Sequence, residues 1–287
     1  MYKGFLMRAN EVVDKRVEEM KAEVERLNLT PKLTIVRVGD DPASVKYVAN
    51  KIKLGERVGI NVDLMLLPEE ITQEKLIEKM KDKIYGEGNT DGILLQLPLP
   101  KHINEDYVLQ EVPCWLDADG FTSQNLGKLM RGEKTVEPCT PKGIMTMLDH
   151  YGIEVEGKDV VIINRSNIVG KPLAMMMLKK NGTVTICHSK TKDLKQKILN
   201  ADIVVTAVGK ANFLNYDNFS HDTTIIDVSI NFDENGKMCG DVCKADYEDL
   251  INHKGCKITP VPNGVGPMTV LSLIENIIEM HKVNKLF

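Results

Sequence analysis

The sequence predicts an α/β protein with two domains, each built around a parallel sheet. Its 287 residues are enough for two cores at about 150 residues per domain. Helix-length amphipathic segments alternate with short apolar runs rich in β-branched residues, which is the pattern of a parallel sheet. A turn-rich stretch over 117–137 interrupts this alternation, which then starts again, so a second sheet is expected to follow the first.

The first half of the chain contains three predicted strands separated by helices. Apolar residues recur at helical spacing near the N-terminus, at Val13, Val17, Met20, Val24 and Leu27. In the segments that follow, the spacing of the apolar residues is in turn that of a strand and that of a helix. The expected elements are a helix over 13–27, a strand over 33–38, a helix that Ser44 caps or opens and that runs to about 58, a strand over 61–67, a helix over 72–85 and a strand over 92–95.

The second half repeats the pattern. Thr140 and Pro141 predict a helix N-cap followed by proline at the first helical position. Apolar β-branched runs over 159–163, 183–187, 203–207 and 224–228 predict four strands with helix-length segments between them. A last helix from 267 to about 282 has an apolar face that must dock on the protein, formed by Val270, Leu271, Ile274, Ile277 and Ile278.

The composition argues against several functional classes. The formal net charge is −4, from 37 basic and 41 acidic residues, and no strongly basic stretch offers the cation density that nucleic acid requires. No apolar run approaches the roughly 20 residues of a membrane helix, and the N-terminus lacks the apolar core of a secretory signal. We therefore expect a cytoplasmic protein with neither a nucleic-acid nor a membrane partner.

The cysteines and histidines do not form a recognisable metal motif. The closest cysteines, Cys239 and Cys243, have three residues between them, whereas common zinc and redox motifs have two. The six histidines are equally dispersed. We interpret the cysteines as reduced thiols and expect no metal.

The strand over 159–163 leads into a candidate nucleotide loop. Residues 164–172 read Asn-Arg-Ser-Asn-Ile-Val-Gly-Lys-Pro, and a strand, a tight loop and a helix N-terminus can hold a pyrophosphate. The segment departs from G-x-G-x-x-G, so an ordinary strand-to-helix turn fits the spacing equally well. The next strand ends in His188, Ser189 and Lys190 instead of the acidic residue that binds the ribose of NAD. A dinucleotide, if bound, is therefore expected to be the phosphorylated form.

Ser44, Tyr47 and Lys51 follow one another at helical steps of three and four, so they share one face of a helix. A lysine beside a phenol can transfer protons if burial lowers its pKa toward neutrality. The same spacing also fits a tyrosine at the edge of the core and a solvated lysine. Taken alone, the spacing favours this second interpretation, which is the commoner situation for such a pair.

Three further segments have the residues of a ligand site. The run from Gln96 to Pro100 follows the carboxyl end of a strand, where open α/β sheets bind ligands, although its prolines also suit a plain loop. Asp117 and Asp119 can accept hydrogen bonds from an amine-bearing heterocycle, but the Asp-Gly step also marks a turn. The rigid, glycine-containing loop over 259–269 suits close approach of the backbone to a ligand or a crossover between domains.

Together these segments resemble the bifunctional methylenetetrahydrofolate dehydrogenase/cyclohydrolase family over almost the entire chain. The similarity rests on five motifs in the family's order: 44–51, 96–100, 117–121 with 138–141, 165–172 and 259–269. It implies a folate-binding α/β domain over 1–139, completed by a C-terminal helix over 267–287, and a Rossmann-like NADP domain over 140–266. It also implies an active site in the cleft between the domains and a homodimer.

The resemblance assigns an activity as well. Such enzymes oxidise methylenetetrahydrofolate by hydride transfer to NADP and then hydrate the methenyl product to formyltetrahydrofolate, in one-carbon metabolism that feeds purine biosynthesis. By motif match, Lys51 is the acid/base residue of the hydration step, Gln96 holds its protonation state, and Tyr47 and Asp119 complete the catalytic set. Tyr47 stacks on the folate and Asp119 anchors its pterin.

The remaining implied site residues fall into two groups. Ser44 supports the lysine, and the folate slot is shaped by Pro98, Pro262 and Gly264. The dinucleotide is expected to contact Thr140, Asn164, Arg165, Ser166, Ile168, His188, Ser189 and Ile230. Arg165 and Ser189 are the expected ligands of its extra phosphate.

Three positions depart from the glycines that the resemblance predicts: Asn164, Ser229 and Asn263. Asparagine tolerates left-handed backbone angles, so the loops are expected to keep their shape. A side chain at 164 is nevertheless expected to crowd the pyrophosphate and weaken NADP binding. This motivates an alternative function, a cyclohydrolase with weak or absent dehydrogenase activity.

Two other functions fit parts of the sequence. A short-chain dehydrogenase would explain the Tyr47 and Lys51 pair, but its nucleotide loop precedes that pair, and here the order is reversed. A non-catalytic folate or nucleotide sensor would keep the pocket without turnover, and the presence of Lys51, Gln96 and Asp119 argues against it. Formation of NADPH from methylenetetrahydrofolate separates these possibilities.

Overall fold

The structure is a computed structural model that describes residues 3–86 and 90–284. The described chain forms two compact units. The six-stranded unit contains residues 3–13 and 140–269, and the three-stranded unit contains residues 14–86, 90–139 and 270–284. Within the described chain, no helix is both long enough and apolar enough to cross a membrane.

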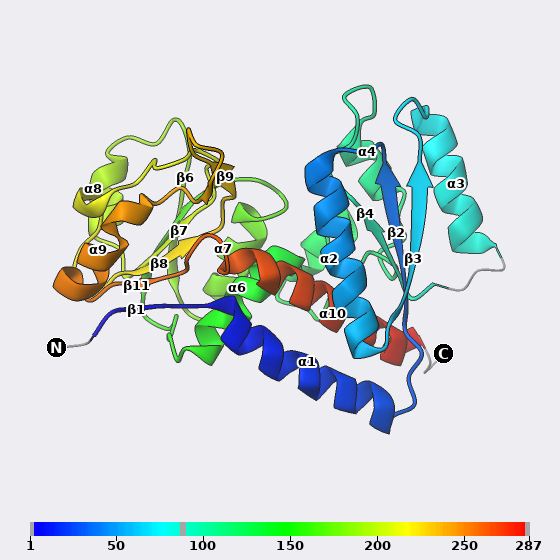
Figure 1. The fold of residues 1–287 in the computed structure, drawn as a ribbon, viewed down its shortest axis with the longest axis horizontal. Coiled ribbons are helices and arrows are strands. Elements are labelled where there is room, and N and C mark those ends of the chain that lie inside the picture. The colour runs from blue at the N-terminus through cyan, green and yellow to red at the C-terminus, as the bar shows by residue number, and fades with distance from the viewer. Residues whose placement is uncertain (1–2, 87–89, 285–287) are drawn as a thin grey trace. The chain divides into compact units, whose positions relative to one another are not determined.

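The sheet of the three-stranded unit has the order β3-β2-β4, and its strands are parallel (Figure 1). The central strand β2 (Lys32–Val38) is buried except at its first residue, because neighbours pair with both of its edges. Its neighbours β3 (Asn61–Leu67) and β4 (Gly92–Leu95) have the predicted bounds. The core cluster of this unit joins Val36 and Val38 to Leu76 and Met80.

Helices α2 (Pro42–Val58), α3 (Gln73–Tyr85), α4 (Glu105–Gln110) and α5 (Ser123–Met130) belong to this unit. The prediction that Ser44 caps or opens α2 is wrong. Asp41 is the N-cap and accepts from the Ser44 backbone N–H, so the helix begins with Pro42 at its first turn. Helix α5 lies inside the stretch predicted to be turns, because its eight residues are fewer than the window of about 11 in which a helical period can be recognised.

The six-stranded sheet has the order β1-β11-β8-β7-β5-β6, and each neighbouring pair is parallel. Strands β5 (Asp159–Ile163) and β6 (Thr183–Cys187) have the predicted bounds. Strands β7 (Ile203–Thr206) and β8 (Thr224–Asp227) each end one residue earlier than expected. From β5 the chain passes to β6 on one side and then to β7 on the other, which makes a topological switch point at β5.

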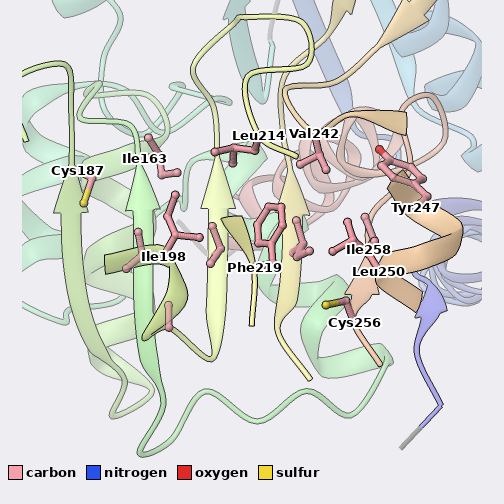
Figure 2. Packing of buried hydrophobic residues seen from close by; sticks show 14 residues of the cluster. Ile163, Cys187, Ile198, Leu214, Phe219, Val242, Tyr247, Leu250, Cys256 and Ile258 are labelled. Atoms are coloured by element: carbon pink, nitrogen blue, oxygen red, sulfur yellow. The ribbon is translucent and has the colours of Figure 1, made fainter. Parts of the chain in front are cut away.

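Helices α6 (Cys139–His150), α7 (Gly170–Lys179), α8 (Leu194–Leu199) and α9 (Tyr247–Lys254) accompany this sheet. A short hairpin joins β9 (Asn231–Phe232) to β10 (Met238–Cys239). Figure 2 shows the core on one face of the sheet, where Phe219 lies among side chains from several strands, with Ile198 of α8 and Leu250 of α9 in the same cluster. The prediction that Thr140 is an N-cap is wrong by two positions, because α6 already begins at Cys139 and its cap position is therefore Pro138.

The terminal segments differ from the expected domain division. Strand β1 (Phe5–Leu6) pairs with β11 (Lys257–Ile258), so residues 3–13 belong to the six-stranded unit although they were predicted to lie in the first domain. A strand of two residues has no readable period, which is why the sequence does not reveal it. The unit boundaries fall inside α1 (Ala9–Arg26), α6 and α10 (Val265–Asn284).

Candidate functional site

Lys51 lies on the buried face of α2, where it belongs to the same stripe as Ser44 and Val48. Only 8% of its surface is exposed, so the interpretation as a solvated lysine is wrong. Its Nζ donates to Gln96 Oε1 at 2.9 Å. Burial lowers the pKa of Lys51 from its usual 10.5, and the charges of Asp119 and Cys139 oppose that effect.

Gln96 follows β4, and its side chain is oriented from two sides. Its Nε2 donates to the Leu97 backbone carbonyl at 2.6 Å, which leaves Oε1 to accept from Lys51. The next peptide bond, Leu97–Pro98, is cis, and Pro98 is exposed. The fixed amide presents an acceptor to the ammonium form of the lysine and no donor to its neutral form. The protonation state of Lys51 is therefore coupled to a rigid partner.

Asp119 is the carboxylate whose negative charge opposes the lowering of the Lys51 pKa. Burial raises the pKa of Asp119, and Lys51 opposes the shift, as does a hydrogen bond from the Cys139 thiol. The two burial effects move the pair toward its neutral forms. Asp117 has a different role: its Oδ2 accepts from the Thr122 N–H at 2.7 Å and from Asn125 Nδ2 at 2.9 Å. The sequence could not separate the two carboxylates, and Asp117 is tied to its own loop.

Two residues near this centre had no predicted role. The Cys139 thiol lies 3.5 Å from the Ala118 carbonyl, next to Asp119 in the chain. Asn276 of α10 donates through Nδ2 to the Ala118 and Glu137 carbonyls, each at 3.0 Å. An asparagine inside the apolar face of the last helix was the available signal, because a buried amide needs partners.

Tyr47 and Ser44 precede Lys51 on the same helix. Tyr47 is half-buried, and burial raises the pKa of its phenol. Ser44 is buried, and its side chain and backbone hydrogen-bond to Asp41, which lowers the pKa of that carboxyl. Ser44 thus hydrogen-bonds to the N-cap residue of its own helix.

The loop after β5 is organised around Asn164. The Asn164 Oδ1 accepts from the Ser166 N–H and the Ser166 hydroxyl, each at 2.8 Å, and from the Gly170 N–H at 3.1 Å. The Asn164 amide therefore turns into its own loop, while the expected crowding of a bound pyrophosphate stays a prediction. A Cβ at Gly170 would lie 2.2 Å from the Asn164 carbonyl oxygen, so this turn requires glycine.

The loops after β5 and β6 leave the sheet side by side, since Ile163 pairs with Cys187 at the strand ends. Arg165, Ser189 and Lys190 are exposed there, and His188 accepts through Nδ1 from the Lys190 N–H. Neither 164–172 nor 188–190 contains a carboxylate. This donor set fits the phosphate groups of a phosphorylated dinucleotide.

The other predicted contact residues of the six-stranded unit lie in its loops and in the first turn of α6. Ile168 and Ile230 are apolar yet 37% and 38% exposed. The hydroxyl oxygens of Thr140 and Thr269 lie 3.0 Å apart and form a hydrogen bond. Pro262 is exposed, and a Cβ at Gly264 would lie 2.4 Å from the Pro260 carbonyl oxygen, so the turn itself requires that glycine.

Comparison with known families agrees with this division of the site. The model of the tetrahydrofolate dehydrogenase/cyclohydrolase catalytic domain matches residues 7–119. The model of the NAD(P)-binding domain of the same family matches residues 138–285, more than half of the chain. The chain belongs to the tetrahydrofolate dehydrogenase/cyclohydrolase family.

Relatives in this family cover nearly the whole chain. The bifunctional protein FolD of Bacillus cytotoxicus is 43% identical over 280 residues, which is 96% of each chain. The crystal structure of the bifunctional FolD of Campylobacter jejuni has a TM-score of 0.91 at 39% identity, covering 98% of this chain and 99% of that one. The Trypanosoma brucei enzyme, described as complexed with NADP cofactor and inhibitor, has a TM-score of 0.91 at 30% identity and covers 99% of each chain.

The three departures from the expected family glycines are accommodated in different ways. Asn263 adopts a left-handed φ of 72°, as expected for an asparagine in place of glycine. Asn164 organises its loop through its side chain. Ser229 is buried, and its hydroxyl donates to Asp241 at 2.8 Å. Each substitution in this family member therefore has a defined local role.

Proposed function

We propose that this protein oxidises methylenetetrahydrofolate with NADP and hydrolyses the methenyl product to formyltetrahydrofolate. The observation that carries the proposal is the buried Lys51, whose Nζ lies 2.9 Å from Gln96 Oε1 and whose pKa is influenced by Asp119. A lysine that burial holds below its usual pKa suits proton transfer near neutral pH. Membership of the family supports both activities.

Lys51 is the proposed proton-transfer group of the hydration step. Water that adds to the cationic methenyl carbon must lose a proton, and the neutral amine of Lys51 accepts it. The resulting ammonium then donates a proton to the ring nitrogen that leaves when the five-membered ring opens. Gln96 stabilises this ammonium through its fixed acceptor oxygen, so the same residue serves as base and then as acid.

The folate is proposed to bind through the residues around this lysine. We choose Asp119 over Asp117 as the folate ligand because Asp117 Oδ2 already accepts two hydrogen bonds from its own loop. We assign Asp119 to the amino group of the pterin and Tyr47 to stacking on its ring system. Support comes from the half-buried ring of Tyr47, one turn before Lys51. Ser44 supports the helix start, and Pro98, Pro262 and Gly264 are assigned to the walls of the folate slot.

The dinucleotide is proposed to bind at the switch point of the six-stranded sheet. When bound there, NADP supplies the hydride acceptor for the methylene carbon. Arg165 and Ser189 are assigned to its additional phosphate, and the exposed Ile168 and Ile230 to apolar contact with its rings. Asn164, Ser166 and His188 of the surrounding loops and Thr140 of α6 are assigned to the same dinucleotide site. The loop segments 164–172 and 188–190 support this assignment, because they contain no carboxylate that would repel a phosphate.

One assay tests the proposal directly. The purified protein is mixed with methylenetetrahydrofolate and NADP, and absorbance is followed at the reduced-nicotinamide band and at the methenyl band. We expect NADPH to form and the methenyl signal to stay low because hydration follows. Absence of NADPH would refute the dehydrogenase assignment, and methenyl accumulation at the uncatalysed hydrolysis rate would refute the cyclohydrolase assignment.

We further propose that the protein acts as a homodimer in the cytoplasm and that its product supplies one-carbon units for purine biosynthesis. The homodimer is supported by the edge strand β6, whose Ile186 is 37% exposed, and by Leu178 of α7, which is 57% exposed. Apolar side chains beside an open strand edge favour pairing with a second copy. Light scattering at micromolar concentration tests this, and a monomer mass would refute it.

A further inference from the structure

The segment Ala207–Lys210 follows β7 at the topological switch point. Loops from the carboxyl ends of β5 and β7 flank this point, and open α/β sheets bind ligands in the crevice between such loops. A loop of this kind contains glycine, here Gly209 with a left-handed φ of 73°, and it is mobile unless other groups hold it. In this protein, side chains hold it from two directions.

Asn164 holds the segment from the side of β5. Its Nδ2 donates to the Ala207 carbonyl at 2.7 Å, while its Oδ1 accepts from Ser166 and from the Gly170 N–H. One carboxamide therefore joins the loop after β5, the first turn of α7 and the loop after β7. A glycine at 164 would make none of these side-chain contacts.

Ser229 and Asp241 hold the segment from the side of β8. The Gly209 N–H donates to Ser229 Oγ at 3.0 Å, and the Ser229 hydroxyl donates to Asp241 Oδ2 at 2.8 Å. Asp241 also accepts from the Val208 N–H at 2.7 Å and from the Lys210 N–H at 2.9 Å. Asp241 is fully buried, so these hydrogen bonds are shielded from competing water.

We infer that Asn164 and Ser229 are positioning residues that preform the dinucleotide crevice by fixing Ala207–Lys210 before the cofactor binds. The inference rests on the proposed function, since it concerns the NADP site. Both residues occupy positions where the family resemblance predicts glycine. At each, the side chain supplies hydrogen bonds to the same segment, which removes conformations that binding would otherwise have to exclude.

The first arm of the test requires no cofactor. Amide hydrogen exchange of segment 207–210 is compared in the full-length protein, Asn164→Ala, Ser229→Ala and the double variant. We expect protection at Val208 and Gly209 in the parent protein and faster exchange of the segment in each variant. Unchanged exchange in the double variant would overturn the inference, because the two side chains would then not immobilise the loop.

The second arm measures the consequence for NADP. Loss of one hydrogen bond changes an equilibrium about three- to tenfold, so Ser229→Ala is expected to raise the Kd for NADP by about that factor, measured by calorimetric titration. Asn164→Ala removes several contacts and is expected to raise it by about tenfold or more. In steady state the KM for NADP rises, while kcat at saturating NADP changes less.

A matched control separates positioning from general loss of stability. Ile144→Val truncates a fully buried side chain of α6 in the same unit, outside the cluster against which Val208 packs, so it should lower the melting temperature and leave the Kd unchanged. Wild-type Kd values in both alanine variants would overturn the inference and leave the proposed function intact. A parent protein that binds no NADP would refute the proposed dehydrogenase, and this inference with it.

Discussion

Replacement of Lys51 by methionine tests the central group of the proposed mechanism. Lys51 is only 8% exposed. Methionine has an unbranched side chain as well, so it fills the volume of the lysine stem while the amine is lost. Removal of a general acid/base typically lowers a rate by about 10²–10⁴. We expect a cyclohydrolase loss in that range, with dehydrogenase turnover still measurable, because hydride transfer depends mainly on placement of the two reactants.

The stability of Lys51→Met is expected to change little. Gln96 Oε1 loses its donor, which costs about 1–3 kcal/mol for an unsatisfied acceptor, but the variant no longer buries an ammonium group. These effects oppose each other, so the melting temperature should move by only a few degrees. Lys46→Met, at an exposed lysine of the same helix, is the matched control and should keep both activities.

The pH dependence gives an independent check. Burial lowers the folded-state pKa of Lys51 below 10.5, so its desolvation cost is fully present below that pKa and disappears as pH rises toward 10.5. The wild type should therefore gain stability relative to Lys51→Met as pH rises, measured by urea unfolding. Its cyclohydrolase rate should rise with pH on a limb that the variant lacks. Equal cyclohydrolase rates in both proteins would refute the reasoning.

Three other substitutions test separate parts of the structure. Asn276→Leu leaves a buried carbonyl at Ala118 and a partly buried one at Glu137 without their amide donor, so we expect a loss of about 2–4 kcal/mol in urea unfolding, and wild-type stability would contradict this. Gly170→Ala puts a Cβ 2.2 Å from a backbone oxygen, so the KM for NADP should rise about tenfold or more, and an unchanged KM would show that the loop adapts freely. Burial raises the pKa of Asp227 from 3.8 to about 7, so wild-type stability should fall relative to Asp227→Asn between pH 4 and pH 7, by up to about 4 kcal/mol. Parallel pH profiles in calorimetric unfolding would refute that pKa.

Local sequence patterns determined most strands and the ends of several helices. The runs over 61–67, 92–95, 159–163 and 183–187 have the predicted bounds. The buried strands β4 and β5 are continuous apolar runs, and the more exposed edge strands β3 and β6 are still rich in apolar and β-branched residues. Short elements escaped prediction. Strand β1 has two residues and α5 has eight, which is too few for a strand or helical period to be recognised in the sequence.

Helical spacing placed Ser44, Tyr47 and Lys51 on one face, but it could not say whether that face was buried. Only packing placed Lys51 at 8% exposure and brought Gln96, 45 residues away, within 2.9 Å. Packing likewise tied Asp117 to its own loop. A pKa depends on burial and on charges from distant parts of the chain, and neither is encoded in local spacing.

The sequence by itself determined which residue types were available at each loop, and the tertiary structure decided what they contact. Asn164 illustrates the difference: the sequence showed a side chain where glycine was expected, and its direction followed from donors at Ser166 and Gly170 and an acceptor at Ala207. Residues near in sequence share a helix or strand period, whereas the partner of a buried amide is set by strands that adjoin only after folding.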